Sequence, residues 1–430
     1  MLNILMINLP AEGHVNPTLS LVKAFTERGD HVHYITTEHF KGRIEDLGAT
    51  VYTHPDLLKD ISIDTETSYG LNSFFHVHVQ TSLYILEITK QLCESINFDF
   101  VIYDIFGAGE LVKEYLQIPG IVSSPIFLIP TEFLETLPFH PNAEIPFQPD
   151  EISEQLLYRM EHEFGVKPKN NLQFMHNKGD ITLVYTSRYF QPNSDLFGEN
   201  NIFIGPSISK RKTNVEFPLE LLKGKKVIYI SMGTLLEGLE PFFNTCIDTF
   251  SDFKGVVVMA IGDRNDRSKI KKAPDNFIIA SYVLQSEILN EADVFITHGG
   301  MNSVHDAIYF NVPFVIIPHD KDQPMIAQRL TELEAAHRLL KEHVNVQSLK
   351  EAVTDVLLNE KYKHGIRKLK DSFLQCGGAK EAISVIKSLL NKYCKSYKSI
   401  EAQPLCFYMI ILQTAQQYLH VKKQYQTQEQ

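Results

Sequence analysis

The sequence alternates apolar runs of strand length with longer stretches that carry apolar residues at helical spacing. The first apolar runs are NILMINL at 3–9, HVHYITT at 31–37 and ATVYTH at 49–54. TLSLVKAFTERG, at 18–29, has helical spacing and ends at a glycine. Near-continuous apolar strands that alternate with helices are typical of a parallel sheet covered on both faces. The pattern therefore predicts an α/β fold that begins β-α-β-α-β.

The alternation occurs twice along the chain. The first half continues with apolar runs at 100–106, 120–126 and 181–187, and we expect the last of these to be its final strand. Residues 188–224 are instead rich in turn formers and charge, which indicates a linker between domains. Apolar runs then resume at 226–233, 255–262, 276–283, 293–298 and 313–319. The sequence thus predicts two doubly wound, Rossmann-like domains.

These patterns set the expected domain boundaries. We place the N-terminal domain at 1–207, the linker at 208–224 and the C-terminal domain at 225–377. A helix follows at 378–394, and residues 395–430 are expected to form a poorly packed tail. In doubly wound sheets, ligands bind outside the carboxyl ends of the strands. The natural site is therefore a central cleft that the two domains face.

Composition narrows the functional class. A length of 430 residues suits two domains, and 44% hydrophobic with 22% charged residues is typical of a globular protein. The net charge is −11 and the sequence suggests no basic face, so we expect no nucleic-acid partner. Five scattered cysteines without a CxxC pair favour a cytoplasmic location over a disulfide framework or zinc site. No stretch approaches the ~18 apolar residues of a membrane span, so we expect no stable membrane insertion.

A dense polar motif, THGGMNSVHD at 297–306, follows one of the apolar runs. Its two glycines permit a sharp turn from strand to helix, and Asn302 or Ser303 can cap that helix. The start of a helix offers free N–H groups and the positive end of its dipole, both of which favour phosphate. Taken alone, the motif fits a plain capped helix as well as a diphosphate site with His298 at the strand end and Asp306 on a ribose.

Flanking motifs decide between the two interpretations. SYVLQSEIL at 281–289 precedes the motif, and Val312-Pro313 and IPHDKDQP at 317–324 follow it. Together with GHVNP at 13–17 and FIGPS at 203–207, these motifs resemble the UDP-glycosyltransferase superfamily over residues 1–390. The likeness is greatest to the bacterial macrolide and natural-product glycosyltransferases. It implies a GT-B fold whose final helix, here 378–394, crosses back to the N-terminal domain.

The resemblance also implies roles for residues of the nucleotide-sugar donor site. Tyr282 stands where the family usually has a tryptophan that stacks on uracil, and Gln285 would bind the base or ribose. Asp306 stands where a glutamate usually holds the ribose hydroxyls. The residues implied for the diphosphate are Ser231, Thr234, His298, Gly300, Asn302 and Ser303, and those implied for the transferred sugar are Asp322 and Gln323.

Three residues depart from the family pattern. Leu284 replaces a proline, while Tyr282 and Asp306 replace a larger aromatic and a longer acid. These changes bear on donor preference and affinity, and none removes a catalytic group. The string DKD at 320–322 resembles the metal-binding DxD of another glycosyltransferase fold. Because a helix start and a histidine already serve the diphosphate, we expect no metal and no cofactor, with the UDP-sugar as co-substrate.

The other half of the chemistry is expected in the N-terminal domain. His14 lies in the loop after the first strand, just before a helix, and titrates in the range that suits a general base. Asp104 ends the strand FVIYD on the same side, whereas Asp99 precedes that strand and so lies at the wrong end. A carboxylate behind an imidazole fixes its tautomer and stabilises the imidazolium. The family uses such a His–Asp dyad at the matching positions.

Aromatic residues gather in two regions without clear β/α patterning, 60–90 and 124–150. They fit either a local core or the wall of an apolar acceptor pocket. The pocket interpretation singles out Phe74, Phe75, Phe127 and Phe133. Two histidine pairs alternate as on strands, His31 with His33 and His76 with His78, but neither has a third ligand at metal spacing.

The sequence thus predicts an inverting, metal-independent enzyme that moves a hexose, expected to be glucose, from a UDP-sugar to a hydroxyl of a hydrophobic small molecule. A glycosyltransferase for membrane lipids, a 2-epimerase of the same fold and a non-enzymatic sugar-nucleotide sensor remain as alternatives. The lipid enzyme calls for a basic, apolar surface that the sequence does not suggest. A sensor needs neither His14 nor Asp104. We expect a monomer or a weak dimer.

Overall fold

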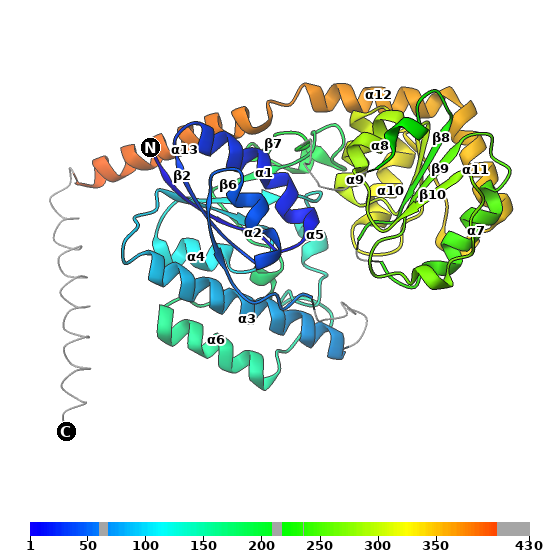
Figure 1. Cartoon of the computed structure of the whole chain (residues 1–430). Helices are drawn as coiled ribbons and strands as arrows, with labels where there is room; N and C mark the ends of the chain where they lie inside the picture. Colours follow the sequence, from blue (N-terminus) through cyan, green and yellow to red (C-terminus); the bar gives the residue numbers. More distant parts are fainter. Residues whose placement is uncertain (60–67, 209–216, 235, 402–430) are drawn as a thin grey trace. The chain divides into compact units, whose positions relative to one another are not determined.

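A computed structural model describes residues 1–59, 68–208, 217–234 and 236–401, with all side chains except those of 68–69 and 394–401. The N-terminal domain follows the predicted alternation (Figure 1). Its main elements are β1 (Asn3–Ile7), α1 (Glu12–Glu27), β2 (His31–Thr36), α2 (Glu38–Glu45), β3 (Thr50–Thr53), α3 (Ser68–Leu92), β4 (Phe100–Asp104), α4 (Gly109–Leu116), β5 (Gly120–Ser124), α5 (Thr131–Leu134), α6 (Glu151–Phe164), β6 (Ile181–Val184) and β7 (Asn201–Phe203).

The C-terminal domain repeats the alternation. Its main elements are β8 (Val227–Ser231), α7 (Glu240–Phe250), β9 (Val256–Ala260), β10 (Phe277–Ala280), α8 (Gln285–Glu291), β11 (Val294–Thr297), α9 (Met301–Tyr309), β12 (Phe314–Ile316), α10 (Gln323–Glu332), β13 (Ala336–Arg338), α11 (Val346–Leu358) and α12 (Glu360–Leu374). The last described helix, α13 (Gly378–Glu401), extends beyond residue 394. The residues from Glu381 onward form a unit separate from Met1–Lys380.

Each domain is built on one parallel sheet. Within the described residues the strand orders are β3-β2-β1-β4-β5-β6-β7 and β10-β9-β8-β11-β12-β13. In both sheets the chain starts at the middle and winds to one edge, then returns to the middle and winds to the other. The carboxyl ends of β1 and β4, and those of β8 and β11, therefore lie side by side. The predicted doubly wound α/β architecture is confirmed.

The alternation of side chains along each strand explains why both faces of the C-terminal sheet are covered. Tyr229 and Phe295 pack into an apolar cluster with α8, α9 and α10. Ile228 and Ile230 point to the opposite face and pack with α7 and α11. Figure 1 shows the two groups of helices on opposite sides of β8–β10. Apolar residues are needed at every strand position, which is the reason for the near-continuous apolar runs.

Several local predictions were wrong. His76 and His78 lie on α3, a helix of 25 residues, and not on a strand. His14 lies within the first turn of α1 and not in a loop before it, because the helix already begins at Glu12. The strands β7 and β13 were missed, each being only three residues long.

The helices of the described residues were also compared with the length and hydropathy that a membrane span requires. None of them is both long and apolar enough to cross a bilayer.

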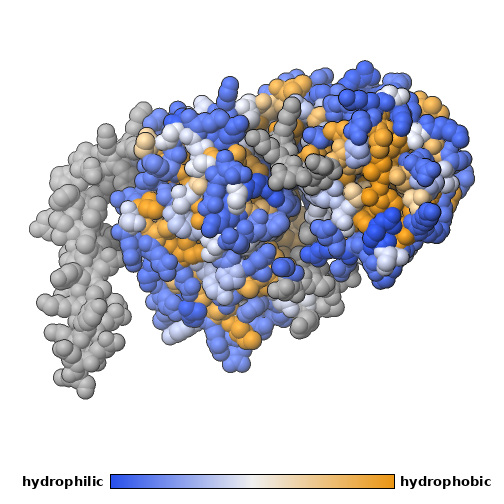
Figure 2. All heavy atoms as spheres, viewed as in Figure 1, coloured by the Kyte–Doolittle hydropathy of each residue, from blue (hydrophilic) through white to orange (hydrophobic). Residues whose placement is uncertain are grey.

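The space-filling view shows a face on which hydrophilic residues predominate, with smaller hydrophobic areas among them (Figure 2). This distribution follows from the strand pattern, since the largest apolar side chains are used in the cores. Tyr34, Phe100, Phe243 and Phe314, for example, are fully buried.

Candidate active site

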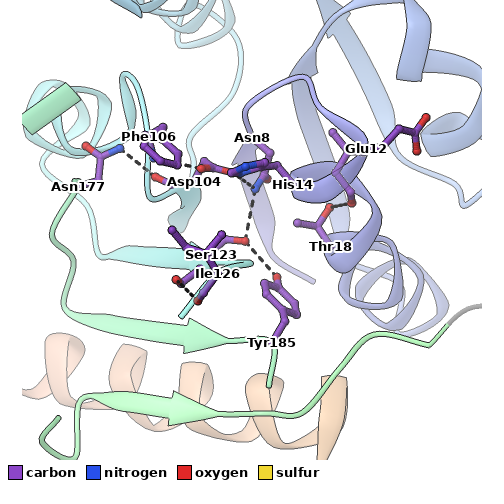
Figure 3. Close-up of polar contacts among 12 residues, drawn as sticks. Asn8, Glu12, His14, Thr18, Asp104, Phe106, Ser123, Ile126, Asn177 and Tyr185 are labelled. Atoms are coloured by element: carbon purple, nitrogen blue, oxygen red, sulfur yellow. Dashed lines mark hydrogen bonds and ion pairs between the residues drawn. The ribbon is translucent and has the colours of Figure 1, made fainter. Parts of the chain in front are cut away.

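His14 and Asp104 come together at the carboxyl ends of β1 and β4 (Figure 3). Asp104 is the last residue of β4, and His14 follows β1 in the first turn of α1. The imidazole Nδ1 lies 2.9 Å from the Asp104 Oδ2. Asp104 is almost completely buried, whereas the His14 side chain keeps 15% of its surface exposed. A molecule can therefore reach the imidazole but not the carboxylate.

Further donors fix the Asp104 carboxylate. The Asn8 side chain donates from 3.2 Å to Oδ2, and the Phe106 backbone N–H donates from 3.0 Å to Oδ1. Because a carboxylate only accepts hydrogen bonds, the neutral His14 ring carries its proton on Nδ1 and leaves a lone pair on Nε2. This is the tautomer that a general base requires.

The pKa of His14 reflects opposing influences. Burial lowers it, but the charge and the hydrogen bond of Asp104 raise it more, with help from the Asp322 carboxylate, so that the pKa lies above 6.5. The same proximity acts on Asp322, whose pKa burial raises and the charge of His14 lowers. Asp322, which the sequence assigns to the transferred sugar, thus lies close enough to His14 for their charges to interact.

His298 lies at the centre of the predicted diphosphate site, packed between two glycines. A Cβ on Gly233 would lie 2.7 Å from its Cε1, and one on Gly300 would lie 2.8 Å from its Nε2. Gly233 has a φ of +80°, so this turn after β8 favours glycine for two reasons. Ser231 ends β8 beside Thr297, while Thr234 is exposed in the turn. The structure therefore brings the ends of β8 and β11 together around the imidazole.

The start of α9 has a different cap from the one predicted. Gly300 is the N-cap, and no described side chain caps the helix. Asn302 and Ser303 lie inside the first turn, because the helix begins at Met301. The Asn302 amide is instead within 3.4 Å of the Glu12 carbonyl at the start of α1. The first N–H groups of α9 are left without a side-chain cap, which is what an anion site at a helix start needs.

Gln285 connects Asp306, which was predicted to hold the ribose, with Ser303, which was predicted to hold the diphosphate. Its amide nitrogen donates to the Asp306 Oδ2 at 2.7 Å, and its carbonyl accepts from the Ser303 hydroxyl at 3.3 Å. Gln285 is therefore partly a positioning residue for the two groups on α9. Tyr282 lies just before it with 39% of its surface exposed, as a stacking platform requires.

Gln323 has a structural use beside its predicted role in sugar binding. Its carbonyl oxygen accepts from the His319 backbone N–H at 2.9 Å, and its amide donates to the Asp320 Oδ1 at 3.0 Å. The side chain is 5% exposed, so it holds the turn before α10 in place. Asp322 directly precedes Gln323, and its charge interacts with that of His14.

Comparisons with known proteins bear on this geometry. A family described as "Erythromycin biosynthesis protein CIII-like, C-terminal domain" matches residues 244–389. "Uncharacterized UDP-glucosyltransferase YdhE" of Bacillus subtilis (strain 168) is 54% identical over 392 residues, which are 91% of this chain and 99% of that protein. This chain belongs to the UDP-glycosyltransferase family. The predicted membership, and with it the enzyme class, is confirmed.

More distant proteins agree with this assignment of the glycosyltransferase. "Demethyllactenocin mycarosyltransferase" of Streptomyces fradiae is 25% identical, over 91% of this chain and 87% of that protein. Among solved structures, "Crystal Structure of CalG4, the Calicheamicin Glycosyltransferase" superimposes with a TM-score of 0.76 and 23% identity, over 91% of this chain and 98% of that one. The structural likeness shows the fold, GT-B, which the sequence also predicted.

A lysine that the sequence analysis did not single out, Lys321, lies near the predicted donor residue His298. Burial, together with the positive charges of His319 and Lys321, lowers the pKa of His298 to about 4, so the ring is uncharged near neutral pH. With these neighbours alone, the His298 ring carries no positive charge. The positive charge of the exposed Lys321 acts to lower the pKa of both His298 and His14. Its place inside DKD was the signal that could have identified it.

A buried polar network behind the dyad was also missed. The Asn8 side-chain oxygen accepts a hydrogen bond from the Tyr34 hydroxyl at 3.1 Å. The Asn8 amide donates to the Ser123 hydroxyl, which in turn donates to the Tyr185 hydroxyl (Figure 3). Asn8 directly follows β1, and Asp104 is the last residue of β4. The same argument from strand ends could have found it.

The four phenylalanines proposed for the acceptor pocket lie in different surroundings. Phe75 is fully buried in the core of the N-terminal domain. Phe127 is fully buried in the cluster that also contains the α8–α10 side of the C-terminal sheet. Phe133 is 56% exposed, whereas Phe74 packs edge-on against His78 with ring centroids 4.6 Å apart. The structure does not bring the four together.

Proposed function

We propose that this glycosyltransferase transfers glucose from UDP-glucose to a hydroxyl of a hydrophobic small molecule, with inversion and without a metal ion. The observation that carries the proposal is the pair of His14 and Asp104, with Nδ1 and Oδ2 2.9 Å apart and the other ring nitrogen free to act as a base. The preference for glucose draws on the printed name of the 54% identical relative.

In the proposed reaction, His14 Nε2 accepts the proton of the acceptor hydroxyl. The acceptor oxygen forms a bond to the anomeric carbon, and the bond from that carbon to the diphosphate oxygen breaks. UDP leaves with the electron pair. The uncapped N–H groups of α9 and an N–H of His298 would stabilise the charge that develops on the diphosphate. Asp104 would stabilise the imidazolium.

The direct test is incubation with UDP-glucose and a panel of phenols, in the presence of EDTA. We expect a product that is heavier than the phenol by one hexose, release of UDP, and an anomeric proton coupling typical of a β-glycoside. An α-glycoside would contradict inversion, and loss of turnover in EDTA would contradict metal independence.

His14→Ala tests the assigned base. We expect kcat to fall by ~100- to 10,000-fold, which is what a general base contributes, with UDP binding unchanged. Exposed His162→Ala, on α6, serves as the control and should retain full activity. Turnover of His14→Ala close to that of the wild type would show that another group removes the proton.

A further inference from the structure

A small cavity in the N-terminal domain lies beside the proposed catalytic pair. Asn8, His54, His78 and Phe106 are among the residues that line it. The Phe106 ring meets His14 edge-on at 5.7 Å and stacks on His78 at 6.0 Å. Asn8 donates a hydrogen bond to the Asp104 carboxylate (Figure 3). Asn8 and Phe106 thus both line the cavity and contact the proposed catalytic pair.

Both histidines in the cavity wall have an unsatisfied ring nitrogen. His54 is 6% and His78 is 3% exposed. In each, Nε2 is buried and has no hydrogen-bond partner among the described residues. Buried polar atoms nearly always have a partner in the protein or in a bound molecule. Two such atoms at one cavity therefore point to an occupant that completes them.

The chemistry of the occupant follows from the tautomer of His54. Its Nδ1 is 2.9 Å from the Pro55 carbonyl oxygen, so Nδ1 carries the proton and Nε2 has a lone pair. Burial lowers the pKa of His54, and it lowers that of His78 to about 4. Both rings are thus uncharged near neutral pH. The cavity suits a neutral hydrogen-bond donor and not an anion.

We propose that the cavity binds a second hydroxyl group of the acceptor, which donates a hydrogen bond to His54 Nε2 while another hydroxyl reacts at His14. The cavity volume is about 20 Å³, room for one water-sized group and too little for an aromatic ring. The preferred acceptor is therefore a phenol that carries a further hydroxyl. This inference rests on the proposed function and names the acceptor class of the same site.

Two substitutions of His54 separate its two ring nitrogens. In His54→Asn the amide nitrogen can take the place of Nδ1 and keep the bond to Pro55, but nothing replaces Nε2. In His54→Gln the amide oxygen can reach the Nε2 position and accept the hydroxyl. The readout is the ratio of kcat/KM for isomers of dihydroxynaphthalene to that for 1-naphthol, which differs from them by one hydroxyl.

We expect the wild type to prefer at least one dihydroxy isomer by about tenfold, as one buried hydrogen bond allows. His54→Asn should lose this preference, His54→Gln should retain most of it, and kcat/KM for 1-naphthol should change little in either variant. His78→Asn tests the second nitrogen, and His162→Asn is a control on an exposed histidine. A wild type without preference, or a His54→Asn variant that loses activity equally on all acceptors, would overturn the proposal.

Calorimetric binding of the same naphthols without a sugar donor keeps this test separate from that of the proposed function. If no phenol is glucosylated but dihydroxynaphthalene binds about tenfold more weakly to His54→Asn, the cavity proposal stands and the proposed reaction fails. If phenols are glucosylated and this substitution changes neither binding nor preference, the reaction stands and the cavity proposal fails.

Discussion

The pKa of His14 links the geometry of one residue pair to the pH dependence of the enzyme. Burial alone would lower this pKa, and the Asp104 charge reverses the shift. A general base acts in its neutral form, so kcat/KM should rise with pH up to and through the raised pKa and then level off. The rise is therefore expected to centre above pH 6.5, and its position reports the influence of Asp104.

Asp104→Asn should move this rise to lower pH, because the substitution removes the largest influence that raises the pKa of His14 while burial remains. The plateau should fall on the order of 100- to 10,000-fold, since the amide no longer stabilises the imidazolium. The measurement is a pH profile of kcat/KM for both proteins. Asp99→Asn, at the opposite end of β4, is the control. A rise that stays in place or moves to higher pH would contradict the assignment.

At the residue scale, a substitution of Lys321 is expected to separate protein stability from UDP affinity. It has a φ of +57°, a left-handed conformation that costs a lysine on the order of 1 kcal/mol and a glycine almost nothing. Lys321→Gly should therefore leave the protein as stable as before, or more so. It also removes the cation beside His298 and His14, so the Kd for UDP should rise about three- to tenfold, and by less at high salt.

Asn311→Gly provides the matched control for Lys321→Gly. Asn311 has the same φ of +57° but lies after α9. It should be as stable as the wild type or slightly more so, because asparagine tolerates this conformation better than lysine does. Its affinity for UDP should equal that of the wild type, with both properties measured on the same preparations. Equal UDP affinity in wild type and Lys321→Gly would mean that the lysine has no part in donor binding.

At the scale of elements, we expect the turn after β8 to affect UDP binding as much as the start of α9, because both pack against His298. Gly233→Ala places a methyl group 2.7 Å from the His298 ring on a backbone with a φ of +80°. The ring must move, so the Kd for UDP should rise by about tenfold or more while naphthol binding is kept. Gly198→Ala, where the new methyl group meets nothing within 4 Å, should leave both unchanged. Normal UDP affinity in Gly233→Ala would show that this packing is dispensable.

The sequence predicted the elements well where their pattern is long. The near-continuous strands at the middle of each sheet were all found, because burial on both faces demands apolar residues throughout. The misread segment, HVHV, alternates over only four residues, and that is too short to exclude a helix. The buried residues Phe75, Val79, Leu83 and Leu86 show the helical spacing of α3, but they lie among many other apolar residues.

The site could be predicted only in part for a related reason. Strand ends are visible in a sequence, so His14 and Asp104 could be expected to lie together, and they do. Contacts between side chains from separate turns are not visible in this way. The Gln285–Asp306 hydrogen bond and the cavity at His54 and His78 arise from packing, and no spacing rule indicates them.

At the scale of the whole molecule, His305 has a structural role that its sequence context did not indicate. It lies on α9, is 4% exposed, and its Nε2 is 3.1 Å from the Thr186 hydroxyl, just after β6 of the other sheet. Its ring also packs edge-on against Phe190 and Phe373. Arg329 of α10 adds hydrogen bonds to the carbonyls of Tyr189 and Phe190. The segment after β6 is thereby bound to α9 and α10.

Burial lowers the pKa of His305 to about 3, far below its ordinary 6.5. Below pH 6.5 the unfolded chain binds a proton there that the folded protein does not, so the free energy of unfolding should fall as pH drops from 6.5 toward 3. His305→Gln can keep the bond to Thr186 without titrating. It should flatten this dependence by up to about 1.4 kcal/mol per pH unit, measured by urea unfolding between pH 5 and 8. Exposed His343→Gln is the control, and parallel curves for His305→Gln and wild type would show that His305 does not account for acid sensitivity.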